Sequence, residues 1–216
     1  MLVAFVGKAR SGKDTAADYL REKGVVQEKD KLARWLKDVS SELFGIPLSV
    51  IEGLEGDREA LFERPKVFTA EHFKRIRDEV HPTYHLIKGL PLVGRHLFSV
   101  REILQFIGSD VVRSMDSDFH VKNLAQRLDP RKVTAVTDVR FENELRGLKQ
   151  REALTVYVYR PHLTLVGGAS EHVSEKVDAL AKLCDVTLVN DGSKEEYLAK
   201  LDLLAERITN ARSSKV

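Results

Sequence analysis

The chain has 216 residues, 43% of them hydrophobic, so it is long enough to bury a full core and one domain is expected. Its net charge of +2 gives no field of the kind that marks a nucleic-acid-binding or membrane-surface protein. The single cysteine, Cys184, excludes an internal disulfide and fits a reducing compartment. No apolar run approaches the ~20 residues that span a bilayer, and the apolar start is too short for a signal peptide. We therefore expect a cytoplasmic protein.

A glycine-rich loop lies near the N-terminus, between a short apolar run and a helical pattern. The run covers residues 2–6, and residues 7–15 have the sequence G-K-A-R-S-G-K-D-T. Strand, G-x-x-x-x-G-K loop and helix in this order are typical of phosphate binding, because loop N–H groups and the positive helix end converge on the ligand. Gly7 and Gly12 permit the turns, and Lys13 adds a charge for the outer phosphates. The residues expected to contact the donor are Gly7, Ala9, Arg10, Ser11, Gly12, Lys13, Asp14 and Thr15.

The position after the loop lysine departs from the usual pattern. A serine or threonine hydroxyl ordinarily meets Mg²⁺ there, whereas this chain has Asp14 followed by Thr15. Two arrangements stay open: Asp14 meets the ion, directly or through water, or Thr15 takes a related role.

Helical and strand-like stretches alternate along the rest of the chain, which favours an α/β fold with a largely parallel sheet. Besides residues 2–6, the expected strands are residues 24–26, 132–137, 154–159 and 186–189. The expected helices are residues 30–44, 71–80, 99–113, 117–128, 142–150 and a last helix that Ser193 and Glu196 begin with a capping box. Residues 81–98 hold two prolines and two glycines and are expected to form a loop.

The expected helix over residues 99–113 carries two stripes. One is apolar and buried. Beside it stand Arg101, Gln105 and Gly108, at positions i, i+4 and i+7. An arginine, an amide and a gap on one flank would suit a cleft for an anion and a planar base. The alternative is a solvated flank with a glycine that serves packing.

Two polar segments follow later strands. Asp138 and Arg140 come at the carboxyl end of an expected strand, where α/β sheets bind ligands. Asp138 would hold Mg²⁺ through water or hold catalytic arginines in place, and Arg140 would meet a phosphate; a salt-bridged strand end is the alternative. Residues 160–176 contain a Gly-Gly pair together with Arg160 and His172, which suits a hinged lid.

These motifs together resemble bacteriophage-type deoxynucleoside monophosphate kinases, and the resemblance covers most of the chain. It rests on the G-K-D-T form of the loop and on V-R-E-I-L-Q-F-I-G-S-D over residues 100–110, with Arg113 beyond. It continues with D-F-H-V over residues 118–121, T-D-V-R-F-E-N-E over residues 137–144 and H-V-S-E over residues 172–175. The family often has tryptophan where His120 stands, and a family pattern close to F-A-D-P-L-K is L-A-R-W-L-K in residues 32–37.

The resemblance implies a P-loop NTPase fold of the nucleoside monophosphate kinase type, with a five-stranded parallel sheet flanked by helices. It implies one kinase domain over residues 1–216, with a mobile acceptor-binding segment at about 30–115 and a lid at about 160–176. The implied reaction moves the γ-phosphoryl of ATP to the 5′-phosphate of a deoxynucleoside monophosphate, with Mg²⁺. No nucleic-acid or membrane partner is implied, a homodimer stays open, and a phage-encoded protein would work in the host cytoplasm.

The resemblance also implies roles for individual residues. Catalytic roles fall to Lys13, Asp138, Arg140 and Arg160. Contacts with the acceptor fall to Lys37, Arg101, Gln105, Arg113, Arg140 and His172. Asn190 and Gly192 would lie near the adenine of ATP, and Mg²⁺ would be met by Asp14, Thr15 or Asp138, the last through water.

Two other functions stay open at this stage. One is another small-metabolite kinase of the same fold, such as a phosphomevalonate kinase, in which the G-K-D loop occurs, or a dephospho-coenzyme A kinase, which an Asn-Asp-Gly turn before the last helix resembles. The other is a P-loop protein that senses nucleotide and transfers nothing. Detection of a phosphate acceptor would exclude the second.

Overall fold

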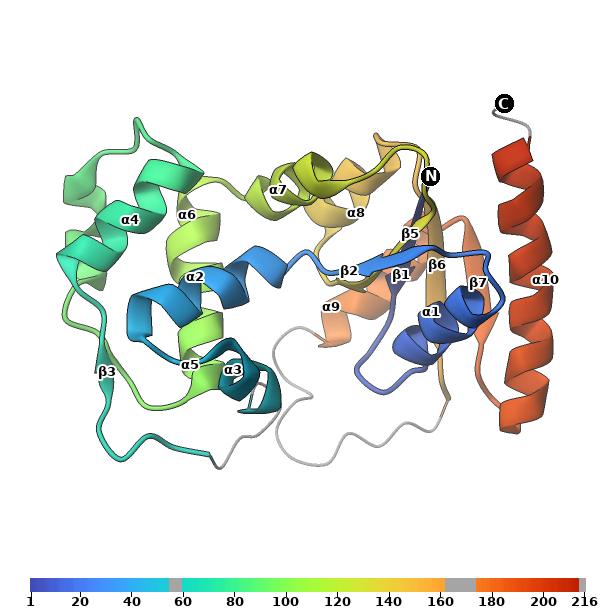
Figure 1. Cartoon of the computed structure of the whole chain (residues 1–216), viewed down its shortest axis with the longest axis horizontal. Helices are drawn as coiled ribbons and strands as arrows, with labels where there is room; N and C mark the ends of the chain where they lie inside the picture. Colours follow the sequence, from blue (N-terminus) through green and yellow to red (C-terminus); the bar gives the residue numbers. More distant parts are fainter. Residues whose placement is uncertain (55–59, 162–173, 214–216) are drawn as a thin grey trace. The chain divides into compact units, whose positions relative to one another are not determined.

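The computed structural model describes residues 1–54, 60–161 and 174–213, and the chain divides into two compact units (Figure 1). The first unit is formed by Met1–Leu32 together with Leu124–Val216, and the second by Ala33–Asn123. Most of the expected lid, with His172, lies outside the described residues. Within the described ranges, no helix combines the length and the apolar character needed to cross a membrane.

The first unit is built on a sheet of five parallel strands in the order β2-β5-β1-β6-β7. This confirms the expected α/β class and the parallel five-stranded sheet. The strands are β1 (Leu2–Val6), β2 (Glu28–Asp30), β5 (Thr134–Val139), β6 (Leu154–Tyr159) and β7 (Val186–Val189). Because all five run in the same direction, the segments that follow β1, β5, β6 and β7 leave the sheet at one edge.

The central strands lie between two layers of helices (Figure 1). Because successive side chains of a strand point to opposite faces, they pack alternately against one layer and the other. Val3 and Phe5 share a core with α1 (Lys13–Glu22) and α10 (Lys194–Ser213). The helix α8 (Glu142–Lys149) contacts β1 and β6, and its Leu145 and Leu148 are fully buried. The short α9 (Ser174–Ala179) bonds to β6, because the Tyr157 hydroxyl donates to Asp178. The packed helices therefore hold the sheet in place, and with it the loops at the carboxyl ends of its strands.

The expected strand over residues 24–26 is wrong. Gly24 adopts a left-handed φ of 73°, and the N–H groups of Val25 and Val26 both donate to the carbonyl of Leu20. These residues therefore close the end of α1, and the strand forms over residues 28–30. Two adjacent valines suggested a strand, but the αL glycine and the return to Leu20 use their donors locally.

The chain leaves the first unit after Leu32 and returns to it at Leu124. Hydrogen bonds within the first unit hold the backbone near both of these points. Arg127 donates from Nε to an Asp30 carboxylate oxygen at 3.1 Å and from Nη2 to the carbonyl of Lys31 at 3.1 Å. The N–H of Leu32 donates to Asp138 at 2.8 Å. Since Asp30 lies in β2, the helix expected from residue 30 begins only at Arg34.

The second unit is mainly helical and has its own core. Its elements are α2 (Arg34–Phe44), α3 (Leu48–Leu54), α4 (Ala70–Val80), the 3₁₀ helix η1 (Leu86–Leu92), α5 (Val100–Gln105), the π-helix η2 (Phe106–Val112) and α6 (Arg113–Met115), with an antiparallel pair β3 (Lys66–Val67) and β4 (His96–Leu97). The helix α7 (Phe119–Arg127) runs across the boundary in the sequence between the two units. Trp35 anchors the core by an edge-on contact with Phe119, at a ring-centroid distance of 4.6 Å.

Two expectations for the second unit need correction. Residues 81–98 are not a plain loop, because they contain η1 and β4. The helix expected over residues 99–113 begins at Val100, with the Ser99 hydroxyl accepting from the N–H of Glu102 at 3.1 Å. However, it becomes a π-helix from Phe106, where the N–H of Arg113 donates five residues back to the carbonyl of Gly108. The wider turn breaks the regular i, i+4, i+7 spacing on which the second stripe was based.

Candidate phosphate-binding site

The glycine-rich loop follows β1 and ends in α1, and both of its glycines occupy positions closed to other residues. Gly7 has a φ of 150°, and a Cβ placed there would lie 2.4 Å from the carbonyl oxygen of Val158. Gly12 has a φ of 109°, and its Cβ would lie 2.8 Å from the side-chain nitrogen of Asn190. The loop thus lies directly against β6 and against the end of β7, as the strand–loop–helix motif requires.

The variant Gly7→Ala should lower the free energy of unfolding by about 3 kcal/mol, because its methyl group would overlap a backbone carbonyl of the central strand β6. Urea unfolding followed by circular dichroism measures the change. Gly45→Ala is the matched control: Gly45 has a φ of 60°, but an added Cβ would have no atom within 4 Å, so only conformational strain should remain, at about 1 kcal/mol. Equal losses in the two variants would contradict the close approach at Gly7.

Two side chains from distant elements hold the loop backbone. The Asn190 amide donates to the carbonyl of Ser11 at 2.9 Å, and the Tyr197 hydroxyl donates to the carbonyl of Gly12 at 3.0 Å. Tyr197 is almost fully buried, and this burial raises the pKa of its hydroxyl. The sequence places Tyr197 in the predicted last helix but gives it no role at the loop. The only signal for such a role is its hydroxyl group. The contact of Asn190 with adenine stays a prediction.

Gly192 has a local role in the turn before α10. A Cβ on Gly192 would lie 1.9 Å from a carboxylate oxygen of Glu196. That carboxylate accepts from the N–H of Ser193 at 2.7 Å, and the Ser193 hydroxyl accepts from the N–H of Glu196 at 3.2 Å. The expected capping box is therefore confirmed, and Gly192 leaves the room in which it forms.

Lys13 is the buried cation of the loop. The residue is only 9% exposed, and Nζ donates to the carbonyl of Lys8 at 2.6 Å. Burial lowers the pKa of Lys13 to about 8; the carboxylates of Asp14 and Asp138 oppose this shift, and the charge of Arg140 adds to it. Asp14, Asp138 and Arg140, which the sequence also indicated as site residues, therefore lie close enough to Lys13 to influence its pKa.

Three oxygen-bearing residues near the start of α1 and the end of β5 were expected to meet Mg²⁺. Asp14, in the first turn of α1, accepts from the Thr137 hydroxyl at 2.9 Å, and Thr15 is exposed. Asp138 accepts from the N–H of Leu32 at 2.8 Å. Among the described residues, no group of three or more His, Cys, Asp or Glu side chains could hold a metal ion by itself. Mg²⁺ ordinarily needs only one or two carboxylates when phosphates and water complete its coordination.

Arginines from the two strands beside β1 approach the loop region. Arg140 follows β5 and is exposed; its N–H and that of Phe141 both donate to the buried carboxylate of Glu144, at 3.0 and 3.1 Å. Arg160 follows β6 and donates from Nη1 to the carbonyl of Arg10 at 3.4 Å. Glu144, which the sequence placed only within a motif, therefore fixes the backbone that presents Arg140.

Four of the expected acceptor residues lie in the second unit. Lys37 is buried on α2, Arg101 is half-buried on α5, and Gln105 is exposed at the end of α5. Arg113 begins α6, directly after the π-helix. Gly108 is a packing residue, since a Cβ there would lie 3.0 Å from a methyl carbon of Leu36. The roles of these four polar residues toward an acceptor stay predictions.

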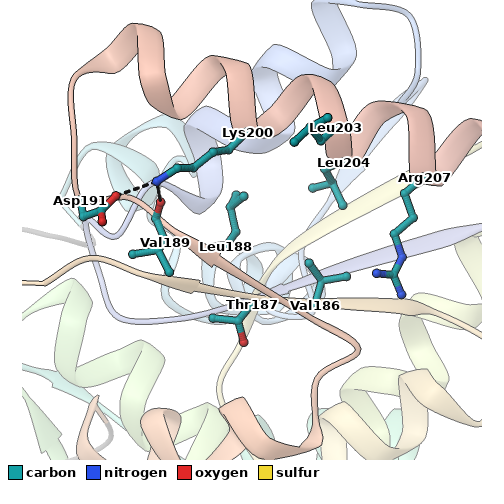
Figure 2. A pocket seen from close by; sticks show the side chains of 9 residues that line it. All are labelled: Val186, Thr187, Leu188, Val189, Asp191, Lys200, Leu203, Leu204 and Arg207. Atoms are coloured by element: carbon teal, nitrogen blue, oxygen red, sulfur yellow. Dashed lines mark hydrogen bonds and ion pairs between the residues drawn. The ribbon is translucent and has the colours of Figure 1, made fainter.

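A separate cavity of about 600 Å³ lies between β7 and α10 (Figure 2). Leu188 and Leu204 line it, and Arg207 lies at one end. Lys200 donates to the carbonyl of Val189 at 2.9 Å and pairs with Asp191 at 2.7 Å (Figure 2). None of its lining residues belongs to the loop or to the expected catalytic set, so this cavity is not the phosphate-binding site.

Comparisons with known proteins add two findings. Residues 62–201 match the family model described as deoxynucleotide monophosphate kinase. A solved structure, shikimate kinase from Aquifex aeolicus vf5, is similar at 14% sequence identity over 96% of each chain, with a TM-score of 0.43. No curated protein sequence matches the chain. The matched range begins after the glycine-rich loop, so the loop and the family match are separate observations.

Proposed function

The chain belongs to the deoxynucleotide monophosphate kinase family, and on this premise we propose that it transfers the γ-phosphoryl group of ATP to the 5′-phosphate of a deoxynucleoside monophosphate. Family membership makes the protein a phosphotransferase with a small-molecule substrate. The proposal adds the donor and the acceptor. The observation that supports the proposal most directly is the burial of the Lys13 cation in a loop whose glycines leave no room for side chains.

The charged groups around Lys13 suit phosphoryl transfer. This reaction depends on positioning and on positive charge around the moving group more than on a covalent nucleophile. The acceptor is itself an ionised phosphate, so no strong general base is needed. In the proposed mechanism Lys13 holds the β- and γ-phosphates, while Arg140 and Arg160 stabilise the charge that develops on the transferred group. The loop N–H groups and the start of α1 hold the remaining phosphate oxygens.

The donor set near Lys13 fits Mg²⁺. Asp14, Thr15 and Asp138 would supply oxygen ligands, which this hard cation prefers, and two carboxylates would be enough when the ATP phosphates contribute the others. Bound Mg²⁺ would neutralise phosphate charge during transfer. The hydroxyl of Ser11 is also suggestive, because it is buried and has no hydrogen-bond partner in the described part of the chain. A phosphate oxygen in the loop would satisfy it.

The apparent affinity for ATP should fall above about pH 8. Phosphate binding needs the protonated ammonium of Lys13, and burial lowers the pKa of this group to about 8. Below that pH the charge is present, and above it the unliganded enzyme loses the charge. We expect kcat/KM for ATP to decrease about tenfold per pH unit well above the pKa. In the variant Lys13→Arg, whose charge persists to higher pH, this decrease should disappear from the pH profile.

The proposed function is tested by the release of ADP from ATP and Mg²⁺ with single acceptors. The panel contains the four common deoxynucleoside monophosphates, their ribose counterparts, phosphomevalonate and dephospho-coenzyme A. Turnover with one or more deoxynucleotides, together with the matching diphosphate, would support the proposal and give the base preference. Turnover with phosphomevalonate or dephospho-coenzyme A alone would contradict the acceptor. Tight ATP binding without any acceptor-dependent turnover would favour a nucleotide sensor.

A further inference from the structure

A Lys–Asp–Tyr cluster connects the glycine-rich loop to β6 and α9. Lys8 is the second residue of the loop, and its Nζ lies 2.7 Å from a carboxylate oxygen of Asp178. The other carboxylate oxygen of Asp178 accepts from the Tyr157 hydroxyl at 2.5 Å. The pKa of Tyr157 is raised, first by burial and then by this bond. The loop is therefore connected through the side chain of Lys8 to α9, and through Asp178 to the strand β6.

The cluster holds the side chain of Lys8, and the backbone carbonyl of Lys8 accepts a hydrogen bond from Lys13. The carbonyl of Lys8 accepts from Lys13 Nζ at 2.6 Å and from the N–H of Ser11 at 3.2 Å. A shift of Lys8 would thus move the acceptor that positions the loop lysine. Asp178 also pairs with the side chain of Lys8, which directs this cation toward α9.

We propose that Asp178 is a positioning residue for the donor phosphates, acting through the side chain of Lys8, which it holds so that the loop is already in its phosphate-binding conformation. The inference rests on the proposed function. Asp178 itself touches no phosphate. Pre-organisation of this kind raises the affinity for the donor because less conformational freedom is lost on binding.

The chain offers a matched control with the same chemistry. Asp202 on α10 pairs with Lys23 at 3.1 Å and accepts from the Tyr19 hydroxyl at 2.8 Å. This second Lys–Asp–Tyr cluster connects α1 to α10, and none of its members belongs to the glycine-rich loop. Asp178→Asn and Asp202→Asn therefore remove the same charge from two similar, half-exposed clusters of one unit.

The experiment measures the dissociation constant of a non-hydrolysable ATP analogue with Mg²⁺ by calorimetry, together with the melting temperature. Asp178→Asn should weaken binding about fivefold, whereas Asp202→Asn should change it less than about twofold. Lys8→Met should weaken binding to a similar extent, and the double variant Lys8→Met with Asp178→Asn should be no weaker than either single variant. Lys8→Arg, which keeps the cation, should bind nearly as the wild type does.

The outcomes separate this inference from the function on which it rests. Unchanged or tighter binding in Asp178→Asn, with a wild type that binds the analogue, would overturn the positioning role and leave the proposed function intact. Additive losses in the double variant would also overturn it, because Asp178 would then act without Lys8. A wild type that does not bind the analogue would contradict both. A lower melting temperature in Asp178→Asn without weaker binding would assign the cluster to stability alone.

Discussion

Replacing Lys13 by alanine should reduce phosphoryl transfer by about 10³-fold or more while the fold stays intact. Activity should be lost because Lys13 is the buried cation of the loop, which we propose holds the β- and γ-phosphates of ATP. The fold should not suffer, because burial lowers the pKa of Lys13 to about 8, so that near pH 7 the folded state carries a charge that its surroundings disfavour. Steady-state kinetics and thermal unfolding measure the two effects.

Loss of the Lys13 charge should not destabilise the fold near pH 7. A lysine whose pKa is lower in the folded state than in the unfolded chain makes the fold less stable as pH falls from the unfolded pKa of 10.5 through about 8. The melting temperature of Lys13→Ala at pH 7 should therefore equal or exceed that of the wild type. Lys23→Ala, at the other end of α1, is the control and should keep full activity. Appreciable turnover in Lys13→Ala would remove the loop from the proposed mechanism.

The parts of the structure that could be predicted from sequence are those whose cause is local. The capping box of Ser193 and Glu196 forms as its spacing indicates, since both bonds join residues three apart. Gly45 ends α2 with a φ of 60°, as a glycine after an apolar helical stripe suggests. The glycine-rich loop belongs to the same class, because its glycines and lysine lie within seven residues of one another.

The strand expected over residues 24–26 failed for a local reason: two adjacent valines have the composition of a strand, but the carbonyl of Leu20 accepts from both of their N–H groups. Elsewhere the sequence failed because a distant partner decides the outcome. No local pattern indicates that Asn190 donates to the carbonyl of Ser11 or that Tyr197 donates to the carbonyl of Gly12. Each of these bonds joins residues that are more than 170 positions apart. Pairing of the loop with Asp178 has the same origin.

The π-helix shows a third kind of failure, in which the pattern is correct but the geometry changes. Val100, Ile103, Ile107 and Val111 are all buried, as the apolar stripe predicts. A π-helix also keeps apolar residues on one side, so the pattern does not reveal where the turn widens. Arg101 precedes the wider turn and Arg113 follows it, so their relative direction could not be read from regular helical spacing.

Arg101→Ala should raise KM for the acceptor about 100-fold and change KM for ATP less than about twofold, because a guanidinium bound to a phosphate in two places contributes two charge-assisted hydrogen bonds. Arg101 lies in α5, whose first turn is fixed by Ser99, and it is half-buried, so its backbone is held while its side chain keeps an exposed part. Initial rates at varied ATP and varied acceptor, with the deoxynucleotide found in the panel, give the two constants separately.

The matched control is Arg75→Ala, since Arg75 is an exposed arginine of the same unit whose partners are Glu79 and Glu42. Its ion pairs lie on the surface and should leave both KM values unchanged. If Arg101→Ala leaves the acceptor constants at the wild-type values, the acceptor phosphate is bound elsewhere, and Lys37 and Arg113 become the cations of the second unit to test. If Arg101→Ala raises both KM values equally, Arg101 supports the folded unit and does not select the acceptor.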